Sequence, residues 1–158
     1  MISVALLAAA VLSLVSFCFR RKRLHGLALA FGWLVALFIK DALFVVAFLN
    51  MRIVEIPAST GAMALRIVNI YILTPVIVMW GVDASAVAAG ALRKLWAWAA
   101  AAAALVAFDA AFVAAGAWKP VQGWSLALSA GESALVYAAA ALATAAFARA
   151  MRKDGIPA

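Results

Sequence analysis

Five ionisable side chains lie inside hydrophobic stretches that are long enough to cross a lipid bilayer: Lys40, Asp41, Arg66, Asp109 and Glu132. A charge at the centre of a bilayer costs about 3 kcal/mol or more unless it is paired or hydrated, so such residues are read as functional by default. Buried carboxylates that outnumber the cations beside them are suited to binding a proton or a further cation. Two carboxylates around one cavity could also act as acid and base.

The three carboxylates are expected at one depth in the membrane. Asp41 and Asp109 each lie nine residues before the predicted outer ends of their spans, and Glu132 lies eight residues after the predicted outer start of its span. At a rise of 1.5 Å per residue, all three lie roughly 12–14 Å from the outer helix ends. Arg66 lies shallower, and its long side chain can reach down. The sequence therefore predicts one polar layer shared by four helices.

The charges of this layer do not balance, because two cations face three carboxylates. A surplus buried carboxylate is expected to take up a proton or to bind a cation. Lys40 and Asp41 are adjacent and point about 100° apart on a helix. We therefore expect one of them to contact the third span and the other to contact the fourth or fifth.

Two uncharged polar residues belong to the same candidate site. Asn69 shares a helix face with Arg66 at a spacing of three residues. Ser129 lies on a stripe with Ser125 and Glu132, which would give the fifth span a polar strip from the outer surface to the carboxylate. Gly131 would permit a close helix approach beside it. The predicted ligand- or ion-binding residues are Lys40, Asp41, Arg66, Asn69, Asp109, Ser129 and Glu132.

The elements that must position these residues are membrane-spanning helices. Of the 158 residues, 70% are hydrophobic and 12% are charged, and the mean hydropathy is +1.15. The apolar runs are continuous rather than alternating, which indicates helices and not barrel strands. We predict an all-α polytopic integral membrane protein, in which residues 1–158 form a single bundle of five transmembrane helices. The predicted spans are about 2–19, 27–50, 62–82, 95–118 and 124–147.

The distribution of basic residues predicts the orientation. The first span is followed, not preceded, by basic residues, so we interpret it as a retained span rather than a signal peptide. With the N-terminus outside and the C-terminus cytoplasmic, two basic residues, Arg52 and Lys119, face outward. Nine face inward: Arg20, Arg21, Lys22, Arg23, Arg93, Lys94, Arg149, Arg152 and Lys153. The alanine richness is typical of a GC-rich bacterial genome and suggests the bacterial cytoplasmic (inner) membrane.

Three further expectations concern packing. Alanines recur every fourth residue in the fourth span and predict a packing seam, at Ala99, Ala103, Ala107, Ala111 and Ala115. Pro75 should kink the third span, and Asp83 or Ser85 should cap a helix. Tryptophans are expected at the membrane interfaces, at Trp80, Trp96, Trp98, Trp118 and Trp124.

Several chemistries find no support in the sequence. One histidine, His25, and one cysteine, Cys18, argue against haem and zinc sites, and the cofactor is left unassigned. A basic face with interleaved aromatic residues is missing, which argues against nucleic acid as a partner. The sequence has no glycine-rich phosphate loop, nucleophile elbow or HExxH motif that would indicate an enzyme.

Three function classes remain open. The first is a small membrane protein with a charged pocket in the outer half of the bilayer, which binds or transports a proton, a cation or a small cationic or amphipathic ligand. The second is a non-catalytic accessory or assembly subunit of a larger membrane complex. The third is an intramembrane enzyme acting on a lipid-soluble substrate. In each case the lipid bilayer is a partner, together with a homo-oligomer or a partner membrane subunit.

Overall fold

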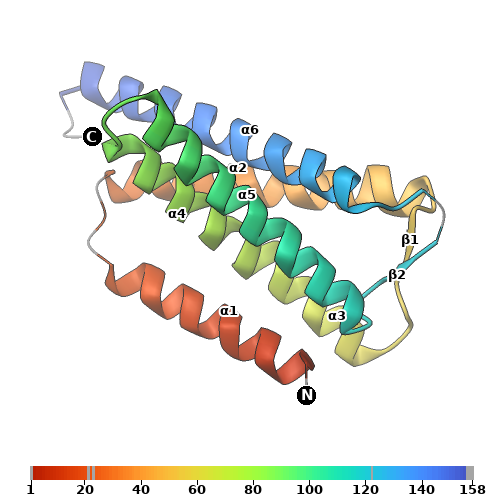
Figure 1. The fold of residues 1–158 in the computed structure, drawn as a ribbon. Helices are drawn as coiled ribbons and strands as arrows, with labels where there is room; N and C mark the ends of the chain where they lie inside the picture. Colours follow the sequence, from red (N-terminus) through yellow and green to blue (C-terminus); the bar gives the residue numbers. More distant parts are fainter. Residues whose placement is uncertain (1, 21, 23, 122, 156–158) are drawn as a thin grey trace.

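The computed structural model describes residues 2–20, 22, 24–121 and 123–155, and the chain in these ranges is mostly helical (Figure 1). Arg21 and Arg23, which the orientation argument uses, lie outside the described residues. The elements in chain order are α1 (Ile2–Phe19), α2 (Gly26–Leu43), η1 (Phe44–Asn50), β1 (Val54–Glu55), α3 (Thr60–Ile67), η2 (Val68–Leu73), α4 (Thr74–Val87), α5 (Ala91–Ala114), β2 (Lys119–Pro120) and α6 (Leu126–Lys153). Both η segments are π-helical.

The prediction of five helices that are long and apolar enough to span a membrane is confirmed. Segments η1 and η2 continue their neighbouring α-helices, so α2 with η1 forms one rod and α3, η2 and α4 form another. In the bundle, α2 packs closely on α6, and α4 packs on α5. Helix α1 lies along the side of this bundle, against η2, α4 and α5 (Figure 1). The membrane orientation stays a prediction.

The boundaries of the fourth and fifth spans differ from the prediction. Helix α5 begins at Ala91 and ends at Ala114, so it starts and stops four residues earlier than expected. It ends there because Gly116, at φ 74°, allows the N–H of Ala117 to bond the carbonyl of Phe112, the usual termination by a left-handed residue. Helix α6 begins at Leu126 and continues to Lys153.

The predicted caps at the start of the fourth span are wrong. Asp83 and Ser85 both lie inside α4, and α5 starts after Gly90, which supplies no side-chain cap. The carboxylate of Asp83 instead accepts a hydrogen bond of 3.0 Å from the backbone N–H of Leu24. Asp83 therefore ties the α1–α2 connection to α4.

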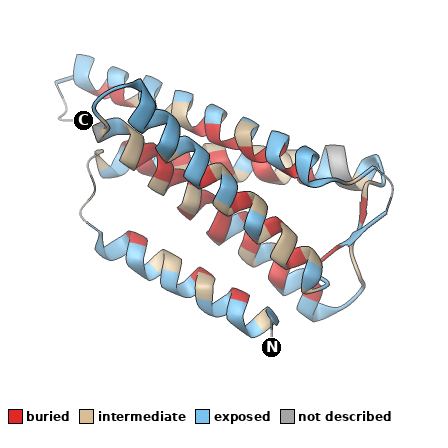
Figure 2. Cartoon of the chain, in the orientation of Figure 1, coloured by how far each residue is buried: buried red, intermediate tan, exposed pale blue. Residues whose placement is uncertain are grey.

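The predicted alanine seam of the fourth span is also wrong for most of its length. Ala99, Ala103 and Ala107 are exposed on the isolated chain, and Figure 2 shows α5 with a long exposed face. The buried stripe is made of Ala101, Leu105, Asp109 and Phe112. Helix α5 is therefore rotated so that Asp109 and the large apolar residues face the bundle. The regular spacing of its alanines does not predict this rotation.

A two-stranded ribbon closes one end of the bundle. Strands β1 and β2 pair antiparallel, and the connection around them buries Trp118, which is 5% exposed. Its ring stacks on Phe112 and meets the edge of Phe44, each at 5.7 Å between ring centroids. Trp118 is therefore a core residue, and its predicted place at the membrane interface stays a prediction. Trp96 and Trp98 are exposed, as expected for such a belt.

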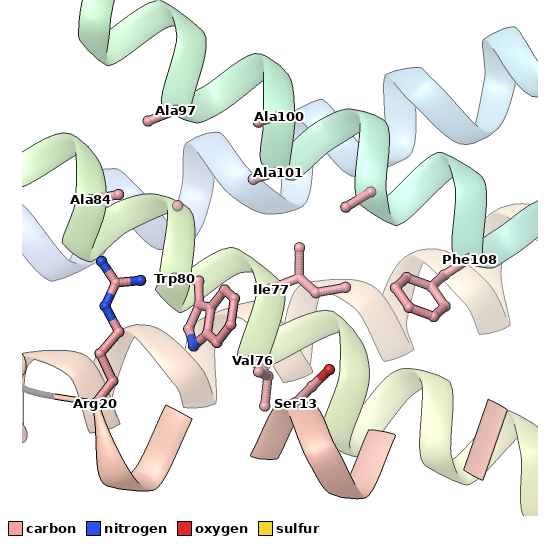
Figure 3. Close-up of a pocket in the computed structure, with 12 residues that line it drawn as sticks. Ser13, Arg20, Val76, Ile77, Trp80, Ala84, Ala97, Ala100, Ala101 and Phe108 are labelled. Carbon is pink, nitrogen blue, oxygen red and sulfur yellow. The ribbon is translucent and has the colours of Figure 1, made fainter. Parts of the chain in front are cut away.

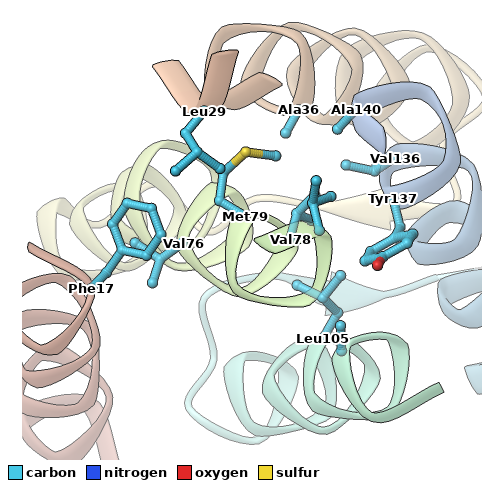
Figure 4. Close-up of a cluster of buried hydrophobic side chains, with 12 residues drawn as sticks. Phe17, Leu29, Ala36, Val76, Val78, Met79, Leu105, Val136, Tyr137 and Ala140 are labelled. Atoms are coloured by element: carbon cyan, nitrogen blue, oxygen red, sulfur yellow. The ribbon is translucent and has the colours of Figure 1, made fainter. Parts of the chain in front are cut away.

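The buried apolar residues form two main clusters. The bundle cluster lies among α1, α2, α4, α5 and α6 (Figure 4) and contains Phe17, Leu29, Ala36, Val76, Val78, Met79, Val82, Ala101, Leu105, Val136, Tyr137 and Ala140. The cap cluster lies toward the ribbon and contains Leu6, Ala10, Phe44, Val54, Leu65, Ile70, Leu73, Phe112, Ala117 and Trp118.

Gly32 is the glycine that the packing of α2 requires. A Cβ added there would lie 2.0 Å from Thr144 Oγ1 and 3.0 Å from Met79 Sδ, so α2, α4 and α6 could not keep their spacing. Gly32→Ala should therefore destabilise the protein by about 1–3 kcal/mol, the usual cost of overpacking. Thermal unfolding in detergent checks this. The control is Gly131→Ala, where nothing lies within 4 Å of the added atom and no loss is expected.

Candidate functional site

A buried ion-pair triad joins three helices. Lys40 of α2 places its Nζ 2.9 Å from Glu132 Oε1 of α6 and 3.5 Å from Asp109 Oδ2 of α5. The three residues are 4%, 9% and 4% exposed for Lys40, Glu132 and Asp109 respectively. One ammonium is therefore shared by two carboxylates, and the fully ionised triad carries one net negative charge.

The two carboxylates of the triad have different surroundings. Asp109 also accepts hydrogen bonds from Asn69 Nδ2 at 3.1 Å and from Ser129 Oγ at 2.5 Å. Thr74 Oγ1 donates in turn to Asn69 Oδ1 at 3.1 Å, which fixes the orientation of the amide. Glu132 Oε1 faces the ammonium of Lys40 and has no further hydrogen-bond donor among the described residues.

The local structure of the third span places Asn69 in this network. Pro75 cannot donate a backbone hydrogen bond, and the helix before it widens into the π-helical segment Val68–Leu73. Asn69 lies in this widened turn and is 1% exposed. Thr74 is a member of the site that the sequence analysis did not assign. Its place beside Pro75, five residues after Asn69, was the available signal.

Apolar residues enclose the triad along the bundle axis. One turn to either side of Lys40 lie Ala36 of α2, in the bundle cluster, and Phe44 at the start of η1, in the cap cluster. On α5 the corresponding neighbours of the aspartate are Leu105 and Phe112. The polar layer is therefore separated from both ends of the bundle by packed side chains, where charge interactions are much stronger than in water.

The other two predicted charges form a separate pair. Arg66 Nη2 lies 3.9 Å from Asp41 Oδ1, and the side chains are 23% and 35% exposed. The guanidinium also lies over the ring of Phe44, 4.9 Å from its centroid. Asp41 thus contacts the third span while Lys40 contacts the fourth and fifth, as expected from their adjacent positions. The five charges therefore form two groups of ion pairs, the Lys40–Asp109–Glu132 triad and the Arg66–Asp41 pair.

The predicted polar strip on α6 holds for Ser129 and Glu132, which are both buried at the site, but not for Ser125. Ser125 is the N-cap residue, and its hydroxyl accepts the N–H of Leu128 instead of leading to Glu132. Gly131 faces open space and does not bring another helix close to the carboxylate. The buried hydroxyls beyond Glu132 on α6 are those of Ser133, Tyr137 and Thr144. Thr144 donates to the carbonyl of Ala140, whereas Ser133 has no hydrogen-bond partner within the described residues.

The depth of the layer also changes with the helix ends. Asp109 lies five residues before the end of α5, and Glu132 lies six residues after the start of α6. These spacings correspond to about 8–9 Å along the helix axis rather than 12–14 Å. The two carboxylates do lie at matching distances from their helix ends.

The triad is a packed contact in this structure. None of four crevices found among the described residues is lined by Lys40, Asp109 or Glu132. One apolar crevice of about 340 Å³ lies between α1, α4 and α5, where Figure 3 shows Ile77 and Phe108 along it and Arg20 beside Trp80 at one end. Within the described chain, no group of three or more His, Cys, Asp and Glu residues could hold a metal ion.

Comparison of the chain with protein-family models, with curated proteins and with solved structures finds no match. The function is therefore argued from the geometry of the triad and its surroundings.

Proposed function

We propose that the chain is a small integral membrane protein whose Lys40–Asp109–Glu132 triad binds and releases a proton. The observation that carries this proposal is the sharing of one buried ammonium by two buried carboxylates. Removing two anions from water is expensive, and one cation compensates only one of them. A proton restores neutrality, and its loss or gain would couple the bundle to a proton gradient.

The packing around the triad favours a proton over a larger occupant. A metal cation or an organic ligand needs space and several free oxygen atoms, whereas the carboxylates here lie in a packed layer between two apolar clusters. A proton needs no cavity. Of the ligands that the sequence left open, namely a proton, a cation and a small cationic or amphipathic molecule, we therefore propose the proton.

The hydrogen bonds indicate which carboxylate exchanges the proton. Asp109 receives three donors, from Lys40, Asn69 and Ser129, and donors to a carboxylate stabilise its charged form. Glu132 shares only the ammonium. We assign the exchangeable proton to Glu132, with Ser133 and Tyr137 as the next hydroxyls along α6.

The test is the infrared spectrum of the purified protein in lipid, recorded across a pH series. We expect a band of a protonated carboxylic acid that Glu132→Gln removes and Asp41→Asn leaves in place. Asp41 is the matched control because it is a carboxylate on a membrane-spanning helix outside the triad. A wild-type spectrum without such a band, or the same band in Glu132→Gln, would refute the proposal. A response that depends on the cation added rather than on pH would assign the site to that cation instead.

One observation favours the accessory-subunit class as a second candidate. The Arg66–Asp41 pair is partly exposed on the isolated chain although it belongs to two membrane-spanning helices, and lipid is a poor environment for charge. A second copy or a partner subunit would cover this pair. Native electrophoresis after mild solubilisation would show a complex that Arg66→Met dissociates. A particle of the same size in both proteins would argue against this candidate.

A further inference from the structure

A crevice with three cations lies at the end of the bundle opposite the β-ribbon. It has a volume of about 410 Å³ between the ends of α4, α5 and α6. Lys94 of α5 and Arg149 and Arg152 of α6 contribute to its lining, and the two arginines are one helical turn apart. Most of the remaining lining is apolar: Leu24, Val82, Ala86, Ala141, Ala145 and Ala148.

These cations have no anionic partner in the described part of the chain. Neither Lys94, Arg149 nor Arg152 forms an ion pair there, and the lining contains no carboxylate. Asp83, which lies next to Val82 on α4, accepts the N–H of Leu24. Three positive charges around one crevice repel one another, so an anion bound between them would relieve this repulsion.

The start of α5 lies close to this crevice, because Lys94 of its first turn belongs to the lining. The helix begins at Ala91 after Gly90, without a side-chain cap, and Lys94 lies at the end of its first turn. The first N–H groups of an α-helix have no partner inside the helix and favour anions, phosphate in particular. Ser85, which also lines the crevice, donates its hydroxyl hydrogen to the carbonyl of Val82 at 2.8 Å and therefore adds no free donor.

We propose that this crevice binds the phosphate of an anionic glycerophospholipid. Arginines suit phosphate because their planar guanidinium presents paired donors. The crevice opens between membrane-spanning helices and has an apolar lining, which suits the glycerol backbone and the first acyl carbons of a lipid rather than a free phosphate ion. Basic pockets of this kind between transmembrane helices are suited to lipid head groups. This inference does not depend on proton binding at the triad.

The experiment measures lipid binding to the full chain by native mass spectrometry in detergent, with phosphatidylglycerol or phosphatidylcholine added. We expect one tightly bound phosphatidylglycerol and no comparable phosphatidylcholine. Neutralising a cation at the membrane surface costs about fivefold in affinity, so Arg149→Gln with Arg152→Gln should weaken binding by about 25-fold. The matched control is Arg93→Gln with Lys153→Gln, which removes two neighbouring cations that do not line the crevice.

Each alternative outcome overturns the assignment. Equal losses in the site pair and the control pair would show diffuse attraction to the basic end of the bundle and no site. Equal binding of both lipids would rule out recognition of the anionic head group. Displacement of the lipid by glycerol phosphate in solution at a similar concentration would assign the crevice to a soluble phosphate. Thermal unfolding of all variants without lipid separates a loss of binding from a loss of fold.

Discussion

Lys40→Met should strongly destabilise the bundle. The methionine keeps the length and apolar stem of the lysine but leaves Asp109 and Glu132 buried without a cation. Breaking a buried ion pair by removing one partner costs about 3–5 kcal/mol, because the remaining charge has lost its compensation. We expect a large fall in the unfolding temperature in detergent and a low yield of folded protein.

The control for this experiment is Arg66→Met at the partly exposed pair. Asp41 loses its partner in this variant, but its side chain is 35% exposed and less desolvated than the carboxylates of the triad, so the loss of stability should be smaller than for Lys40→Met. Adding Asp109→Asn and Glu132→Gln to Lys40→Met removes all three charges and should recover part of the stability, since a neutral polar layer has no uncompensated ion. Equal effects of Lys40→Met and Arg66→Met would contradict the idea of a triad that is electrostatically isolated.

The sequence predicted the membrane-spanning helices well because hydropathy acts locally. The length of each apolar run is enough to identify a helix that crosses a bilayer, and all five were found. The end of α5 was misplaced because the hydrogen bonds that terminate it depend on a positive φ at Gly116. An isolated glycine in an apolar run does not by itself predict that conformation. Trp118 then falls outside the helix and folds back onto Phe112.

The sequence predicted part of the site, namely that Lys40 and Asp41 contact different helices, but not which face of α2 is turned to the bundle interior. The roughly 100° between Lys40 and Asp41 correctly separates their partners, because this angle is a fixed property of an α-helix. Which of the two faces the bundle interior depends on how α2 packs on α4 and α6. Gly32 permits this packing, because a side chain there would overlap Thr144 and Met79. Spacing within one helix contains no such information, so Asp41 could not be excluded from the site.

The role of Thr74 and the buried hydroxyls on α6 required the three-dimensional structure. Thr74 reaches Asn69 because the intervening turn is π-helical. In a π-helix, residues five apart lie one above the other, as residues four apart do in an α-helix. Ser133 and Tyr137 are recognisable as buried only after the neighbouring helices are placed, and Ser133 then lacks a hydrogen-bond partner among the described residues. These polar groups are costly when unsatisfied, which makes them informative about how the triad could exchange a proton.

The two carboxylates of the triad should respond differently to substitution. Asp109→Leu keeps the approximate shape of the side chain but leaves the donors on Asn69 and Ser129 buried without an acceptor. Each unsatisfied buried donor costs about 1–3 kcal/mol, so we expect a loss of about 4 kcal/mol in the free energy of unfolding. Glu132→Gln should cost about 0 kcal/mol, because the amide oxygen still faces Lys40 and the surplus negative charge is gone.

Denaturant or thermal unfolding in one detergent compares these variants directly, and Asp109→Asn provides an intermediate case that keeps an acceptor for Asn69. The same variants also test the proposal that Glu132 exchanges a proton. Glu132→Gln should remain folded while its protonated-acid band disappears, so loss of function and loss of fold are separated in a single variant. If Glu132→Gln instead proved as destabilising as Asp109→Leu, the glutamate would be a structural anion paired with Lys40, and the exchangeable proton would have to be assigned elsewhere.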